Sequence, residues 1–188
     1  MDESTLSTCK IVIAGPFSSG KTTFIKTISQ IDIVSTEKGI SKASKEPEVK
    51  ENTTVAMDFG RIDIDETLVL YIFCTPGARR FDFVWDKLAE GSLGFILMVD
   101  SRYPETFREA RSIFNMFMIY NSGMPCVFAA NFQDSPDAWD VEAVRIALRL
   151  SNDIPIIPCI DTDRESVKGV MIALLNEVLK DIETDVDE

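Results

Sequence analysis

The stretch GPFSSGKTT restricts what this chain can fold into more than any other part of the sequence. It fits the pattern G-x-x-x-x-G-K-[ST] at Gly15, Gly20, Lys21 and Thr22. A β-branched run at residues 11–14 precedes it and a segment of helical periodicity follows it, which is the order that a phosphate-binding loop requires. The glycines let backbone N–H groups and the helix N-terminus face a phosphate closely. The stretch therefore predicts nucleotide binding rather than a glycine turn that only caps a helix.

The residue types within this stretch predict separate roles. The Lys21 ammonium is expected to reach the β- and γ-phosphates, and the Thr22 hydroxyl is expected to bind Mg²⁺. The other residues expected to contact the nucleotide here are Gly15, Ser18, Ser19, Gly20 and Thr23.

Charge and cysteine content exclude several classes of function. The chain has 188 residues and is 45% hydrophobic, which suits one well-buried domain. Its net charge of -12 argues against binding nucleic acid or an anionic membrane. Its four cysteines form no C-x-x-C pair and histidine is absent, so neither a disulfide framework nor a zinc site is indicated. We expect buried thiols in a reducing cytoplasm.

Targeting signals are not evident at either end of the sequence. The start, MDEST, lacks the features of a signal peptide and a myristoylation site, and the end, ETDVDE, lacks a prenylation box. No apolar run approaches the length of a membrane span. We therefore expect a cytoplasmic protein with no direct membrane anchor, whose acidic tail at residues 183–188 is a solvated, frayed end that follows the last helix.

Apolar runs of strand length alternate with segments of helical periodicity along the chain. The predicted strands, with their polar tips, are residues 8–14, 53–65, 66–74, 93–101, 124–134 and 154–160. The predicted helices are residues 21–31, 81–90, 105–120, 138–150 and 165–182. Residues 32–52 are polar and are expected to form a long flexible loop that responds to the γ-phosphate. The alternation predicts one doubly wound α/β domain over residues 1–188, with a mostly parallel sheet and one antiparallel edge strand.

Polar clusters follow four of the predicted strands, at residues 15–22, 75–78, 131–134 and 159–161. Ligands of such sheets bind beyond the carboxyl ends of the strands, so we expect the clusters to meet at one site.

Two further pairs of residues indicate which ligand this site takes. Thr53 and Thr54 end the long loop, where a hydroxyl and a backbone N–H would meet Mg²⁺ and a γ-phosphate, although they also suit an ordinary strand start. Asn131 and Asp134 follow a buried strand, and a carboxylate at that spacing accepts from both guanine N1–H and the exocyclic amine, which adenine does not offer. By itself N-x-x-D is a common loop and cap pattern, but beside a phosphate loop it favours guanine.

Together these motifs resemble the bacterial Ras/Arf-type small GTPases, and most closely the G-protein subunit of actinobacterial conservon systems, in the wider class of gliding-polarity GTPases. The resemblance spans residues 9–180 and rests on GPFSSGKTTF, TTVAMDFGRI, TPG followed by RRFDFVWDKLAEGSLG, NFQD and IPIIPCIDTDRESVK. It implies GTP/GDP and Mg²⁺ as ligands and protein partners of the Roadblock/LC7 type.

The resemblance also implies roles for individual residues. Phosphate binding falls to Gly20 and Lys21, metal binding to Thr22 and Thr54, γ-phosphate sensing to Gly77, guanine reading to Asn131 and Asp134, and further base contact to Cys159, Ile160 and Asp161. Lys21, Thr54 and Gly77 are the residues placed at the reacting phosphate.

Three departures from the general small-GTPase pattern bear on activity. Cys74 stands where an aspartate normally supports Mg²⁺ through water, which puts metal affinity in doubt. Ala78 stands where a glutamine normally orients the attacking water, so intrinsic hydrolysis is expected to be slow. Phe132 replaces a lysine whose stem covers the base, and its aromatic face is expected to cover the base by stacking.

These observations leave alternatives open. One hypothesis is a GTP-hydrolysing signalling switch, helped by a partner that supplies catalytic groups; the other is a nucleotide-bound scaffold with negligible turnover. A small-molecule kinase is disfavoured because N-x-x-D has no kinase role and no arginine-rich lid segment is evident. The oligomeric state is not inferable from the sequence.

Overall fold

The structure is a computed structural model, and it describes residues 7–35, 57–75 and 87–186. Thr54, Gly77 and Ala78, and most of the predicted loop at residues 32–52, lie outside these residues. So does most of the predicted helix at residues 81–90, of which residues 87–89 are described and helical.

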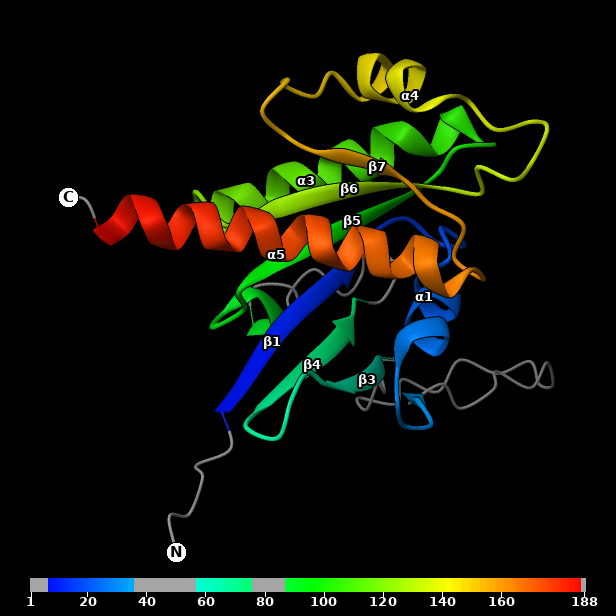
Figure 1. The fold of residues 1–188 in the computed structure, drawn as a ribbon. Helices are drawn as coiled ribbons and strands as arrows, with labels where there is room; N and C mark the ends of the chain where they lie inside the picture. The colour runs from blue at the N-terminus through cyan, green and yellow to red at the C-terminus, as the bar shows by residue number, and fades with distance from the viewer. Residues whose placement is uncertain (1–6, 36–56, 76–86, 187–188) are drawn as a thin grey trace, which may run out of the picture.

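One seven-stranded sheet forms the centre of the fold, in the order β2-β3-β4-β1-β5-β6-β7 (Figure 1). The strands are β1 (Ser7–Ala14), β2 (Val34–Ser35), β3 (Asp58–Asp63), β4 (Leu68–Cys74), β5 (Gly94–Asp100), β6 (Cys126–Asn131) and β7 (Ile156–Pro158). Strands β4, β1, β5, β6 and β7 pair in parallel, whereas β3 pairs antiparallel with both β4 and β2. The predicted doubly wound, mostly parallel sheet with one antiparallel strand is confirmed, and the two-residue β2 lies outside that strand.

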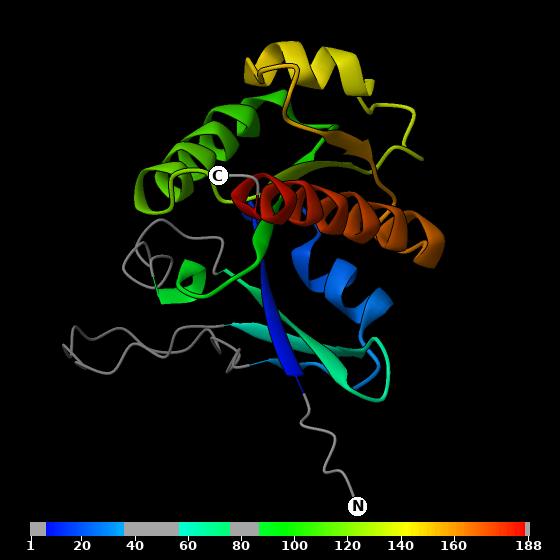
Figure 2. The same ribbon diagram turned by 60° about the vertical axis from the view of Figure 1, so that its left-hand side comes forward.

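Helices cover both faces of this sheet. They are α1 (Lys21–Ile28), the 3-10 helix η2 (Pro104–Thr106), α3 (Phe107–Tyr120), α4 (Val141–Leu148) and α5 (Arg164–Val186). Figures 1 and 2 show α1 and α5 on one face and α3 and α4 on the other. None of the helices in the described residues is long and apolar enough to cross a membrane.

The central strands β5 and β6 are apolar up to their last residue, and β1 is apolar from Ile11 on, because helices bury both of their faces. All seven residues of β5 are buried, and successive side chains contribute to different cores. Phe95, Leu97 and Val99 pack toward α3 and α4, whereas Ile96 and Met98 pack toward α1 and α5. This double burial explains why the runs were readable as strands from sequence.

The first helix ends earlier than its periodicity predicts, at Ile28 instead of residue 31. The chain leaves the helix because it bonds to β3 instead: the Gln30 N–H donates to the Arg61 carbonyl oxygen (2.9 Å), and the Asp63 N–H donates to the Gln30 side-chain oxygen (2.6 Å). The same contacts position Val34 and Ser35 to form β2, within the segment predicted as a loop.

Two other expectations need correction. Helix α5 continues to Val186, so residues 183–186 of the predicted frayed tail are helical. All four cysteines are free thiols as expected, but Cys9 is only half-buried because it lies near the start of β1.

Candidate functional site

The phosphate loop, residues 15–22, connects the buried end of β1 to the first turn of α1. Gly20 has a φ of 99°, and a Cβ there would lie 2.2 Å from the Asn131 side-chain nitrogen and 2.3 Å from an Asp161 carboxylate oxygen. Gly15 is similarly confined, because its Cβ would lie 2.4 Å from the Met98 carbonyl oxygen. The two glycines of the motif are therefore required by close backbone approach as well as by dihedral angle.

Lys21 points back into this loop. Its Nζ donates to the carbonyl oxygens of Gly15 (2.9 Å) and Pro16 (2.6 Å), and the residue is only 9% exposed. Burial lowers the pKa of Lys21 from its ordinary value of 10.5 to about 8, although Cys74, Glu109 and Asp58 act in the opposite direction. The ammonium is thus poised beside the loop but poorly solvated, which favours contact with an anion.

Asp58 lies next to the phosphate loop, although sequence reasoning missed it. The Thr22 hydroxyl donates to its carboxylate, and the residue is 8% exposed. Asp58 is the first residue of β3, where buried positions alternate with half-buried ones, and its side chain turns inward toward α1. The sequence signal for this role was an aspartate between the apolar residues Met57 and Phe59, inside the predicted strand at residues 53–65.

The strand end that carries Cys74 has no carboxylate. Cys74 is buried, its Sγ donates to the Lys21 carbonyl oxygen (3.6 Å), and burial raises the pKa of its thiol well above the usual range. The next residue, Thr75, is 2% exposed, and its hydroxyl has no hydrogen-bond partner among the described residues. A neutral thiol does not replace an aspartate as support for Mg²⁺.

The oxygen atoms near Thr22 fit a magnesium site even so. Mg²⁺ prefers hard oxygen ligands and is usually held by one or two protein groups together with phosphates and water. The Thr22 hydroxyl and the Asp58 carboxylate supply such oxygens. Within residues 7–35, 57–75 and 87–186 no group of three or more acidic, cysteine or histidine side chains converges on a metal position, so the protein alone offers no complete cage.

Asn131 joins three loops at the carboxyl edge of the sheet. Its side chain is fully buried; the amide nitrogen donates to the Ser19 carbonyl oxygen (3.0 Å), and the amide oxygen accepts from the Asp161 N–H (3.0 Å). The phosphate loop, the loop at residues 131–134 (the base loop) and the loop after β7 are therefore held by a single side chain. This confirms the expectation for three of the four polar strand ends; residues 76–78 of the fourth lie outside the described residues.

The other residues of the base loop range from half-buried to exposed. Phe132 has a φ of 65° and stacks under the Arg102 guanidinium, 3.6 Å from the ring centroid, while Asp100 holds that guanidinium (2.7 Å). Asp134 is exposed. Arg102 is a neighbour of Phe132 that sequence reasoning did not name.

The loop after β7 supplies the remaining predicted contacts. Cys159 is buried, and its N–H donates to the Ala130 carbonyl oxygen (2.9 Å), whereas the Ile160 N–H donates to the Ser166 hydroxyl (2.8 Å). Asp161 is 4% exposed, and burial raises the pKa of its carboxyl, with nearby Asp134 adding to the increase. The backbone amides of Cys159, Ile160 and Asp161 are thus engaged, and the Asp161 side chain lies against Gly20.

Most predicted site residues lie together at one edge of the sheet. The structure assembles Gly15, Ser19, Gly20, Lys21, Thr22, Asn131, Phe132, Cys159, Ile160 and Asp161 within linked loops. Ser18 is exposed at the tip of the phosphate loop, and Thr23 is half-buried in α1, where its carbonyl accepts from Thr27. Thr54 and Gly77 lie outside the described residues, so their roles stay predictions.

A protein-family model matches residues 13–181, from the end of β1 into α5, and its description is conserved hypothetical ATP binding protein. The chain belongs to this family. The match to this ATP-binding family covers both the phosphate loop and the base loop. A search of curated proteins found no significant match.

Among solved structures, the chain is similar to the Arl6 BBS3 small GTPase of Trypanosoma brucei, whose structure contains the nucleotide analogue GppNp. The TM-score is 0.69 at 18% identity, and the match covers 93% of this chain and 99% of the other. At that identity the likeness shows the fold alone: this member of the ATP-binding family has a small-GTPase-like phosphate-loop fold.

Proposed function

We propose that this protein is a guanine-nucleotide-binding switch with slow intrinsic GTP hydrolysis. The observation that carries the proposal is the Asn131 side chain, which bonds to Ser19 of the phosphate loop and to Asp161 after β7. A base held by residues 131–134 would then have a defined position relative to phosphates at Lys21. Such a link between base and phosphate subsites is what a nucleotide-specific site requires.

The base loop supports guanine through the chemistry of its two outer residues. The exposed Asp134 carboxylate is free to accept two hydrogen bonds from guanine N1–H and its exocyclic amine. Phe132 offers an aromatic face, and Arg102 already stacks on it, which shows that the ring accepts a planar neighbour. A bound base would then stack on the Phe132 ring, either in place of Arg102 or together with it.

A second candidate is an adenine nucleotide. The specific observation in its favour is the description of the family to which the chain belongs, which names ATP. The phosphate loop and Lys21 would serve either nucleotide, because they contact no base. The choice between a guanine and an adenine nucleotide therefore depends on Asp134.

The metal part of the proposal assigns Mg²⁺ to Thr22 and Asp58, with Thr54 added by resemblance. These residues would hold Mg²⁺, and the metal would supply positive charge to the phosphates of a bound nucleotide. The Asp58 carboxylate compensates for the neutral thiol of Cys74 from the neighbouring antiparallel strand. The Lys21 ammonium balances phosphate charge from the other side of the loop.

The finer parts of the proposal rest on the resemblance of the motifs. We place the chain with conservon-type G proteins related to gliding-polarity GTPases, acting in the cytoplasm through Roadblock/LC7-type partners. Ala78 leaves the attacking water without a glutamine, so turnover would be slow unless a partner supplies a catalytic group. The alternative is a scaffold that binds GTP or GDP with negligible hydrolysis.

Competition titrations against a fluorescent guanine nucleotide test the proposal. GTP and GDP should displace the probe and ATP should not. Asp134→Asn should weaken guanine binding by roughly 1.5 to 3 kcal/mol and improve xanthine binding, because it removes the charge-assisted pair. Asp137→Asn, an exposed aspartate nearby, is the matched control and should change neither.

The outcomes separate the candidates. Equal competition by ATP and GTP would reject guanine specificity, and preference for ATP would establish the adenine candidate. Failure of every nucleotide to bind would reject both. The nucleotide that copurifies with the protein, identified by chromatography of the denatured sample, gives an independent answer.

A further inference from the structure

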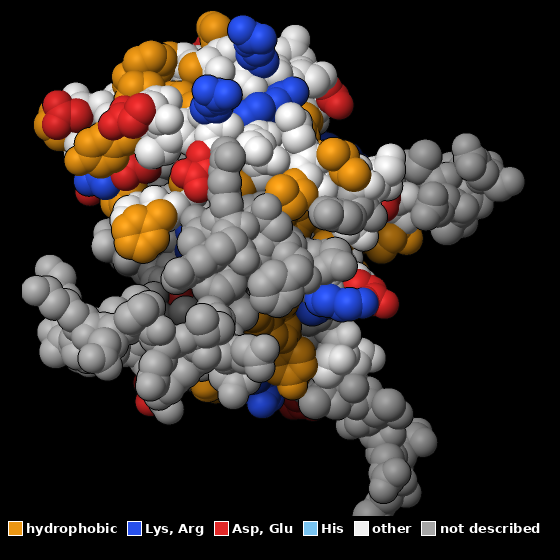
Figure 3. Space-filling view, turned by 180° about the vertical axis from the view of Figure 1, so that it is seen from behind, with side chains coloured by type: hydrophobic (Ala, Val, Ile, Leu, Met, Phe, Trp, Pro, Cys, Tyr) orange, Lys and Arg blue, Asp and Glu red, His pale blue; other side chains and the backbone are white. Residues whose placement is uncertain are grey.

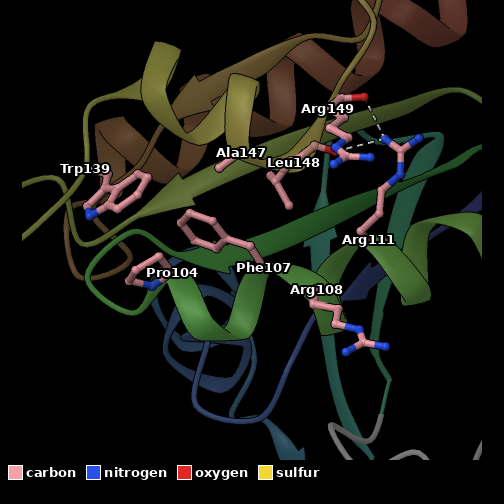
Figure 4. A pocket seen from close by; sticks show the side chains of 8 residues that line it. All are labelled: Pro104, Phe107, Arg108, Arg111, Trp139, Ala147, Leu148 and Arg149. Atoms are coloured by element: carbon pink, nitrogen blue, oxygen red, sulfur yellow. Dashed lines mark hydrogen bonds between the residues drawn. The ribbon is translucent and has the colours of Figure 1, made fainter.

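A pocket of about 490 Å³ lies between α3 and α4, outside the predicted nucleotide site (Figure 4). Phe107, Trp139 and Leu148 form its apolar part, and Arg108, Arg111 and Arg149 line it on the side away from Trp139. Figure 3 shows several basic side chains gathered beside hydrophobic ones at the top of the molecule, where α4 lies in Figure 1. The combination of arginine and tryptophan is typical of protein-binding hot spots.

The apolar part of the pocket is partly open. Phe107 is 4% exposed and packs edge-on against Trp139, with ring centroids 5.9 Å apart, while Trp139 is 42% exposed. The Trp139 backbone is fixed, because its N–H donates to the Ser101 carbonyl oxygen (2.9 Å) and its carbonyl accepts from the Gln133 side chain (3.0 Å). An exposed indole held rigidly offers contact area at little entropic cost.

The three arginines are not neutralised by the fold. None of the ion pairs among the described residues involves Arg108, Arg111 or Arg149. Arg111 donates to the carbonyl oxygens of Leu148 and Arg149, both at 3.0 Å, and so points at the pocket wall. Arg108 and Arg149 are exposed. In a chain with 31 acidic and 19 basic residues, an unpaired arginine cluster is a localised exception to the overall charge.

Charge complementarity indicates what fills this pocket. The pocket has its indole at one end and three arginines toward the other (Figure 4), an arrangement that attracts an apolar side chain next to carboxylates. A nucleic acid would bring a continuous polyanion against a chain of net charge -12, whereas a short acidic peptide confines its charge to the arginines. The peptide is therefore the better match.

We propose that the α3–α4 pocket docks an acidic peptide segment of a partner protein. An apolar side chain of that segment lies against Trp139 and Phe107, and its carboxylates pair with Arg108 and Arg149. The docked segment contacts Trp139, which is hydrogen-bonded to Gln133 of the base loop, and this loop borders the proposed nucleotide site.

Fluorescence anisotropy of the full chain tests the proposal with a synthetic labelled peptide in which glutamates flank a central Leu-Phe pair. The wild type should bind it, and a peptide with glutamine in place of glutamate should bind at least about tenfold more weakly. The Arg108→Gln, Arg149→Gln double variant should lose a similar factor, as should Trp139→Ala. Because Arg149 ends α4, the single Arg108→Gln variant repeats the test without touching the helix end.

The control is Lys168→Gln, Lys180→Gln, which makes the same change of charge on α5, at the opposite face of the sheet. It should bind the peptide as the wild type does. Absence of wild-type binding, equal loss in the control, or equal binding of the glutamine peptide would each overturn the proposal. Arginine-dependent binding of a uridine oligonucleotide in place of the peptide would overturn it in favour of nucleic acid.

Discussion

The side-chain amine of Lys21 is buried, and burial disfavours its charged form. Its Nζ is bonded to loop carbonyls, yet burial keeps its pKa near 8 in the free protein. The folded-state pKa lies below that of the unfolded chain, so the unfolded chain binds more protons between about pH 8 and 10.5. The contribution of Lys21 to stability therefore rises as pH rises through this range.

The affinity for nucleotide should also depend on the protonation of Lys21, but it should fall as pH rises. Phosphates stabilise the ammonium, so binding above about pH 8 takes up a proton, and affinity should fall by up to about tenfold per pH unit there. Lys21→Arg keeps its charge throughout, so the affinity of this variant should lack the decline. Isothermal titration of both proteins with the same nucleotide, from about pH 7 to about pH 9, measures the difference. Parallel curves would contradict the assignment of Lys21 to the phosphates.

Asp58 places a carboxylate beside Thr22, whereas Cys74 offers none, and we propose that this carboxylate supports the metal. Asp58→Asn should leave nucleotide binding without metal nearly unchanged but weaken the effect of Mg²⁺ by roughly tenfold or more. The measurement is the rate of release of a fluorescent nucleotide as Mg²⁺ is titrated. Asp63→Asn, on the same strand but paired with Arg61 at the surface, is the control and should behave as the wild type. If both variants respond alike, Asp58 has no specific part in holding the metal.

At the scale of elements, the site consists of loops tied together at the ends of β1, β6 and β7. Each loop follows a different strand. Strand β1 pairs in parallel with β5, β5 with β6, and β6 with β7, so the carboxyl ends of these strands lie at one edge of the sheet. Asn131 then replaces water as the partner of two backbone groups. Buried amides of this kind determine loop positions because leaving them unpaired is costly.

Asn131→Ala should therefore affect stability and binding together. Loss of two buried hydrogen bonds should lower the free energy of unfolding by about 1–3 kcal/mol, and nucleotide affinity should fall in the same variant. Urea denaturation and nucleotide titration give the two values. Asn115→Ala, exposed on α3, should change stability by less than about 0.5 kcal/mol. A destabilised variant with unchanged affinity would show that Asn131 is structural only.

At the scale of the whole molecule, the fold by itself says less about the activity than the residues of the site do. The sheet and its helices match a small GTPase at 18% identity, and one such fold supports many activities. What distinguishes this chain is the chemistry at the strand ends, where a thiol, a displaced carboxylate and Ala78 replace the common arrangement. The choice between switch and scaffold depends on turnover.

Single-turnover GTP hydrolysis measures that turnover directly. The unassisted protein should hydrolyse GTP at or below a rate on the order of 10⁻⁴ per second. Ala78→Gln should raise the rate if water orientation alone limits it, whereas only the Cys74→Asp, Ala78→Gln double variant should respond if metal support limits it as well. Fast hydrolysis by the unmodified protein would contradict the proposed deficiency.

Much of the architecture was predictable because it is written in local patterns. Strands β5 and β6 and the second half of β1 are apolar runs, and the phosphate loop has a fixed spacing of glycine and lysine. The early end of α1 was not predictable, because the bonds that end it go to β3, more than thirty residues away.

The sequence by itself determined the order of the elements, the phosphate loop and the position of Asn131 after a buried strand, since each depends on residues close together in the chain. Only the tertiary structure decided that Asp58 meets Thr22, that Lys21 is buried and that three arginines line one pocket with Trp139. The physical reason is that these contacts join segments whose proximity arises from strand order and helix packing, and burial of a charge depends on everything packed around it.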